Sequence, residues 1–223
     1  MKQQKLLPLS ALIMGLACLV GRRVLYATSV DGTGLLKAGT PLEWGTYLLS
    51  ALALALFAAA SRQEEGRILP DSVTALGQLI GAVGIGWTTL RYPGEMPGLL
   101  GNLWKILGIV SALCLIWSAC CTAKGKTPHF LVLLAPCLFW LTHLIDNYRG
   151  WSGAPQLQSY LFALLATMAM ALFTYYTAGS AAQVGKRKTF AALAAGYFCI
   201  AAALPGKGQL LYLLCALWAL FSL

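Results

Sequence analysis

The chain has 223 residues, of which 59% are hydrophobic and only 10% are charged. In soluble domains about a quarter of the residues are charged, so this composition excludes a domain that covers its surface with polar groups in water. The net charge of +9 does not indicate nucleic-acid binding, because the basic residues stand in ones to threes between apolar runs instead of clustering on one surface. The apolar runs are continuous, which excludes the alternating pattern of an outer-membrane barrel.

The sequence therefore predicts an all-α protein, a polytopic bundle of transmembrane helices that forms one integral membrane domain over residues 1–223. About eight spans are expected, and the lipid bilayer is the first partner. The last apolar segment has fifteen residues, which is short for a span, so seven spans are the alternative. The expected spans cover residues 6–27, 43–61, 72–90, 99–121, 128–145, 158–180, 189–204 and 209–223.

Three features along these spans carry specific expectations. Arg22 and Arg23 follow the first apolar run, and we expect both to extend to the membrane interface. Gly77 and Gly81 form a small-xxx-small pair, which lets a neighbouring helix approach closely. The seventh span is rich in alanine and glycine, so we expect it to lie inside the bundle.

The orientation follows from the basic residues of the loops. With the N-terminus inside, nine basic residues fall in inner segments and six in outer ones, which favours a cytoplasmic N-terminus and a cytoplasmic C-terminus. The nine inner residues are Lys2, Lys5, Arg62, Arg67, Lys124, Lys126, Lys186, Arg187 and Lys188. The last three form the strongest positive cluster of the chain.

The candidate site lies at the outer end of the fifth span. His143, Asp146 and Asn147 are three and four residues apart, so they share one helix face. A carboxylate, an imidazole and several amides at one interface could hold a small polar ligand or relay protons. The other candidate residues follow in the sequence or belong to the fourth span at a similar depth: Tyr148, Arg149, Trp151, Gln156, Gln158, Tyr160, Asn102 and Lys105.

A purely structural interpretation of the same residues stays open. Tyrosine and tryptophan are enriched at membrane interfaces, Arg149 could pair with Asp146, and Gln156 could cap a helix after Pro155.

The sequence contains no zinc-binding His-Glu-x-x-His, no phosphate-binding glycine loop and no Gly-x-Ser-x-Gly turn. We therefore expect no catalytic residue, no metal site and no cofactor. The seven cysteines lie in or at the ends of apolar segments, where we expect small buried hydrophobic side chains. Acylation of Cys120–Cys121 is the minority alternative.

One segment resembles a known group of proteins. Tyr148-Arg149-Gly150-Trp151-Ser152 and Pro155-Gln156-Leu157-Gln158-x-Tyr160, continuing to Gly185-Lys186-Arg187, are similar to a motif of uncharacterised multispanning membrane proteins of anaerobic bacteria. The resemblance implies a bacterial cytoplasmic membrane and a role for the outer loop. It implies no activity, ligand or cofactor.

Three functions are compatible with these observations. The first is a non-enzymatic integral membrane protein, an accessory, assembly or sensing component with an extracytoplasmic polar and aromatic surface that binds a membrane protein. The alternative is a small-solute transporter or substrate-binding membrane subunit with a small polar ligand. The least supported is a membrane-embedded lipid-modifying enzyme, in which His143 and Asp146 would be the acid–base pair.

Overall fold

The computed structural model describes residues 6–29, 39–62, 71–92, 98–151, 160–179, 185–204 and 208–223. These residues form eight α-helices and no strand, which confirms the all-α class. The helices are α1 (Leu7–Thr28), α2 (Pro41–Arg62), α3 (Asp71–Arg91), α4 (Leu99–Ala123), α5 (Phe130–Trp151), α6 (Leu161–Gly179), α7 (Lys186–Ala202) and α8 (Gln209–Phe221).

Within the described residues, six helices, α1 to α6, are long and apolar enough to cross a membrane. The chain is therefore a multi-pass membrane protein by the length and composition of its helices. The 17 residues of α7 and the 13 of α8 are fewer; at 1.5 Å per residue they extend about 26 and about 20 Å, against a hydrocarbon core of about 30 Å. Full spanning by these two helices stays a prediction.

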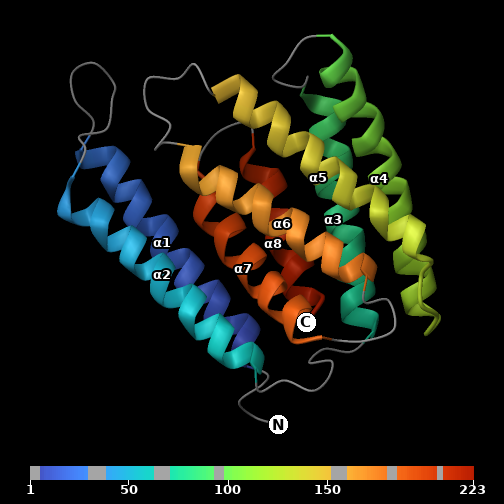
Figure 1. Ribbon diagram of the computed structural model, residues 1–223, viewed down its shortest axis with the longest axis horizontal. Helices are drawn as coiled ribbons and strands as arrows, with labels where there is room; N and C mark the ends of the chain where they lie inside the picture. The colour runs from blue at the N-terminus through green and yellow to red at the C-terminus, as the bar shows by residue number, and fades with distance from the viewer. Residues whose placement is uncertain are drawn as a thin grey trace.

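The helices form a ring with a hairpin beside it (Figure 1). Consecutive helices pack together from α3 to α8, and α8 returns to pack against α3. The α1–α2 hairpin lies on one side of this body and packs mainly on α7. The beginning of α1 and the end of α8 lie at the same end of the bundle.

The helix α7 lies inside the bundle, as its alanine and glycine content predicts. It packs against α1, α2, α6 and α8, and nearly every side chain from Lys188 to Ala202 is buried. Its many alanines make this possible, since small side chains let several helices approach one backbone closely.

The glycines of α3 pack against α8, as the small-xxx-small pattern predicts. A Cβ atom at Gly77 would lie 2.7 Å from the Phe221 side chain, and one at Gly81 would lie 2.7 Å from the Trp218 ring. Real Cβ atoms do not come this close to other heavy atoms. The large side chains of α8 therefore occupy the space that the missing Cβ atoms leave on α3.

The largest difference from the expected boundaries is in α5. The span is expected to end at residue 145, but the helix, which contains Pro136, continues through Trp151. The polar residues after Ile145 remain helical because Asp146 and Asn147 fall on the buried face of the helix, at 1% and 4% exposure. The segment from Asp146 to Trp151 is thus the last part of α5.

Candidate functional site

His143 is the centre of a buried network between α4 and α5. The indole Nε1 of Trp104 donates a hydrogen bond to His143 Nδ1 at 2.9 Å, and the Asn147 side-chain amide lies 3.1 Å from His143 Nε2. The imidazole also stacks on the ring of Phe139, with ring centroids 5.7 Å apart and planes 6° from parallel. His143 is thereby fixed in both position and orientation.

These bonds determine the protonation of the ring. The indole of tryptophan is only a donor, so Nδ1 of His143 carries no proton and accepts the bond from Trp104. The neutral imidazole then carries its proton on Nε2, which lies 3.1 Å from the Asn147 side-chain nitrogen. A 180° turn of the Asn147 amide places its carbonyl oxygen at this position, and the oxygen then accepts the Nε2 proton. A second proton on Nδ1 would face the indole N–H of Trp104 and break this bond. The network therefore holds His143 neutral.

A role for His143 in proton relay or acid–base catalysis would require one of these bonds to break first. Both ring nitrogens already have partners in Trp104 and Asn147. Asp146 is buried beside them at 1% exposure. The arrangement is that of a rigid packing centre, which agrees with the structural interpretation of this face of α5.

The other candidate residues do not converge on His143. Asn102 and Lys105 lie on the exposed face of α4, while Trp104 between them points into the bundle. Tyr148 and Arg149 are exposed at the end of α5, and Tyr160 is half-buried just before α6. Trp151 is the last residue of α5, and Gln156 and Gln158 lie outside the described residues.

The expectation that the Arg22 side chain extends to the membrane interface is wrong. The Arg22 side chain is only 4% exposed, and its Nη1 donates a hydrogen bond to the Ala201 carbonyl at 2.6 Å. Its guanidinium also lies over the Phe162 ring, 4.4 Å from the centroid. Arg23 is exposed. Adjacent helical residues point about 100° apart, so the two arginines do not face the same surroundings.

Arg22 caps the C-terminal end of α7. Ala201 is one of the last residues of α7, where carbonyl groups lack intrahelical partners and carry partial negative charge. The guanidinium satisfies one of these carbonyls. A signal for this was present in the sequence, because Ala11, Gly15, Cys18 and Arg22 recur at helical spacing and form the buried face of α1.

Further polar contacts order the start of α2 and join the hairpin to α7. Glu43 is buried and accepts hydrogen bonds from the Gly39 N–H at 2.9 Å and from the Tyr47 hydroxyl at 3.0 Å. Ser50 Oγ lies 2.9 Å from the Tyr197 hydroxyl oxygen. Ser50 already donates to the Thr46 carbonyl, so Tyr197 is the donor in this pair.

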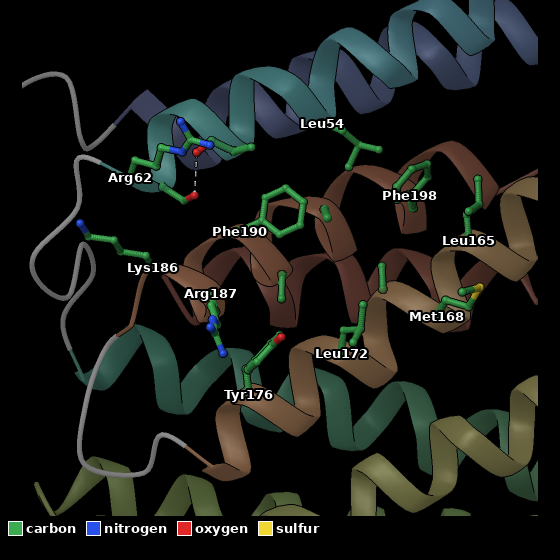
Figure 2. Close-up of a pocket in the computed structure, with 15 residues that line it drawn as sticks. Leu54, Arg62, Leu165, Met168, Leu172, Tyr176, Lys186, Arg187, Phe190 and Phe198 are labelled. Atoms are coloured by element: carbon green, nitrogen blue, oxygen red, sulfur yellow. Dashed lines mark hydrogen bonds between the residues drawn. The ribbon is translucent and has the colours of Figure 1, made fainter.

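Sequence reasoning also missed a groove between α2, α6 and α7, which has a volume of about 540 Å³. Figure 2 shows three basic side chains, those of Arg62, Lys186 and Arg187, at one end of it. Apolar side chains, Phe190 and Phe198 among them, line the remainder. The groove could not be read from the sequence, because its walls come from three segments that are distant in the chain.

Other reactive chemistry is sparse in the part of the chain that the structure describes. No group of three or more histidine, cysteine or acidic side chains there could hold a metal ion. All seven cysteines are free, and Cys18, Cys137, Cys199 and Cys215 are buried as small apolar side chains. The described residues thus offer a rigid polar network at one end and an amphipathic groove at the other.

Comparison with protein-family models, with curated proteins and with solved structures finds no match to this chain.

Proposed function

We propose that this chain is a non-enzymatic integral membrane protein, an accessory, assembly or sensing component that acts by binding a partner protein at the end of α5. The observation that carries the proposal is the division of polar groups on the last turns of α5. His143, Asp146 and Asn147 face inward and are buried, whereas Tyr148 and Arg149 face outward and are exposed.

This division favours binding over catalysis. The inward groups stabilise the helix end through the bonds of His143 to Trp104 and Asn147, which leaves no ring nitrogen available for acid–base chemistry. A rigid helix that displays exposed side chains is a good binding surface, because little conformational freedom is lost on association.

The types of the exposed residues support a protein partner. Tyrosine and arginine are among the residues that contribute most to binding at protein interfaces. The Tyr148 side chain is 54% exposed, whereas that of its neighbour Asn147 is 4% exposed. The sequence continues with Trp151, which adds a third residue type that is common at such sites.

The proposed setting is the bacterial cytoplasmic membrane, with both termini in the cytoplasm and the end of α5 on the outer side. The excess of basic residues in the expected inner segments supports this orientation. The resemblance of the Tyr148–Tyr160 segment to multispanning proteins of anaerobic bacteria supports the bacterial cytoplasmic membrane as the setting.

The test is chemical cross-linking in intact membranes followed by purification of the full chain. The double variant Tyr148→Ala with Arg149→Ala is expected to be as abundant as the wild type and to lose its cross-linked partner. The control is Tyr175→Ala with Lys105→Ala, which removes another exposed tyrosine and another exposed cation. Equal cross-linking in the wild type and in both variants would show that the end of α5 is not the binding surface.

A further inference from the structure

The groove between α2, α6 and α7 is open on the outside of the bundle. Two of its walls belong to α2 and α6, which are long enough to span a membrane. It is lined by residues of all three helices, among them Ala58 and Arg62 of α2, Met168 and Leu172 of α6, and Lys186 and Phe190 of α7. Met168 and Leu172 are about half exposed, at 48% and 49%. A molecule in this groove would therefore touch both the protein and the bilayer.

Charge is distributed unevenly along the groove. Arg62 ends α2, and Lys186 and Arg187 begin α7, so three exposed cations meet at one end. None of the lining residues is acidic. The first turn of α7 also contains no acidic residue, and the first N–H groups of a helix have no intrahelical partner and carry partial positive charge. This end of the groove is thus suited to an anion.

The remainder of the groove is suited to a hydrocarbon chain. Beyond the cationic end its walls are almost entirely apolar and include Leu172, Phe190 and Phe198. Lys186 and Phe198 are twelve positions apart on α7, which corresponds to about 18 Å along the helix. One half of a bilayer's hydrocarbon core is about 15 Å thick. The groove is therefore long enough to reach from the headgroups to the middle of a membrane.

We propose that this groove binds one anionic phospholipid. The phosphate and its headgroup lie against Arg62, Lys186 and Arg187, and an acyl chain follows α7 past Phe190 to Phe198. Under the orientation proposed above, the lipid comes from the cytoplasmic leaflet. The site is at the opposite end of the bundle from Tyr148 and Arg149, so it is independent of the partner surface on α5.

Composition favours a lipid over the other possible occupants. The groove joins a cationic end to a long apolar wall, which matches the anionic headgroup and the acyl chain of one lipid. Free phosphate would use the three cations but none of the apolar walls. A zwitterionic lipid would fill the walls but would leave the cationic end only partly neutralised.

The test measures lipid binding to the detergent-solubilised full chain by native mass spectrometry, with phosphatidylglycerol, phosphatidylcholine and inorganic phosphate as the probes. The groove variant combines Arg62→Gln, Lys186→Gln and Arg187→Gln. Its matched control combines Arg23→Gln, Arg91→Gln and Lys105→Gln, which removes the same charge from three exposed positions outside the groove. Each basic residue near a membrane surface contributes about a fivefold change in affinity for anionic lipid.

The groove variant is expected to bind phosphatidylglycerol about a hundredfold more weakly than the wild type, and the matched control about as tightly as the wild type. Phosphatidylcholine is expected to bind at least about tenfold more weakly than phosphatidylglycerol, and inorganic phosphate not to displace the lipid. An equal loss in the two triple variants, equal binding of the two lipids, or displacement by inorganic phosphate would overturn the proposal.

A second pair of variants tests the apolar walls while all the charges are kept. Ala58→Phe places a ring in the groove, whereas Ala59→Phe places one on the neighbouring exposed position. Ala58→Phe is expected to reduce phosphatidylglycerol binding by about tenfold or more, since it takes the volume of the chain, and Ala59→Phe to leave it unchanged. This pair decides the matter alone if the triple groove variant does not fold. Unchanged binding by Ala58→Phe would overturn the proposal.

Discussion

The two ends of α7 are both next to positive charge, but the charge is held differently. At the C-terminal end a single guanidinium, that of Arg22, is 4% exposed and bonded to the Ala201 carbonyl. At the N-terminal end Lys186 and Arg187 are exposed beside Arg62 along an open groove. The first cation complements the negative end of the helix dipole, whereas the others stand at its positive end, where a cation is unfavourable.

This difference separates a structural use of charge from a binding use. Arg22 is almost fully buried and contacts Ala201 and Phe162, so its contribution is to the stability of the fold. Lys186 and Arg187 oppose the dipole of their own helix, so a bound anion would offset that cost as well as their mutual repulsion. Removing the charge of Arg22 should therefore lower the stability of the fold and leave ligand binding unchanged. Removing the charges of Lys186 and Arg187 should weaken ligand binding and leave the stability nearly unchanged.

The largest expected effect is that of Arg22→Ala. It removes a charge-assisted hydrogen bond to Ala201 and a cation–π contact with Phe162, and we expect the free energy of unfolding to fall by about 3 kcal/mol. Denaturant titration in detergent micelles measures this change. Arg23→Ala, at the exposed neighbouring position, should change it by less than about 0.5 kcal/mol. Similar losses in the two variants would contradict the buried role of Arg22.

The next largest effect is expected for Trp104→Phe. This variant tests whether the network of Trp104, His143 and Asn147 stabilises the fold as Arg22 does. The variant keeps a ring beside Phe139 but leaves Nδ1 of His143 without its donor, and we expect a loss of about 2 kcal/mol. Trp117→Phe on the same helix, at a position 64% exposed, is the control. If Trp104→Phe lowers the free energy of unfolding equally in the wild type and in a His143→Phe background, the hydrogen bond to His143 is not the source of the loss.

A smaller effect is expected where the hairpin meets the middle of α7. Tyr197→Phe removes one neutral hydrogen bond to Ser50, which corresponds to about 1 kcal/mol in the same unfolding titration. Tyr175→Phe, at an exposed position, should have no measurable effect. If Ser50→Ala and Tyr197→Phe are fully additive, the two hydroxyls do not interact and the hairpin is held by other contacts.

The smallest effect is expected from neutralising the open end of α7. Arg62→Gln, Lys186→Gln and Arg187→Gln act on exposed side chains, so in lipid-free detergent each should change the free energy of unfolding by no more than about 0.5 kcal/mol. For Lys186 and Arg187 the change should be slightly stabilising because of the helix dipole. A combined loss above about 2 kcal/mol would place these residues with Arg22 as structural cations.

The sequence was sufficient for the class of the fold and for the order of its helices. Continuous apolar segments separated by polar turns predict helices whose ends lie within a few residues of the observed ones, as for residues 72–90 against Asp71–Arg91. The exception is the end of α5, which lies six residues beyond the expected one. The glycines of α3 and the alanines of α7 also indicated close packing, because small side chains have this effect wherever they lie in a bundle.

The sites could not be predicted to the same extent. The spacing of His143 and Asn147 placed them on one face, but only the position of Trp104 on a different helix shows that the face is closed. Likewise, Lys186-Arg187-Lys188 was visible as a positive cluster, yet Lys188 is buried while its two neighbours line the groove. Which helix covers which face depends on the packing of segments that are distant in the chain, and the spacing of residues within one segment does not show it.

One crossed measurement tests the central claim most directly: thermal unfolding of the wild type, Arg22→Ala and the triple Arg62→Gln, Lys186→Gln, Arg187→Gln variant, each with and without phosphatidylglycerol. We predict that Arg22→Ala unfolds at a lower temperature but keeps the wild-type rise of about 5–10 °C on lipid addition. The triple variant should unfold at the wild-type temperature without lipid and show no rise with it. Loss of the lipid effect in Arg22→Ala, or its persistence in the triple variant, would contradict the account.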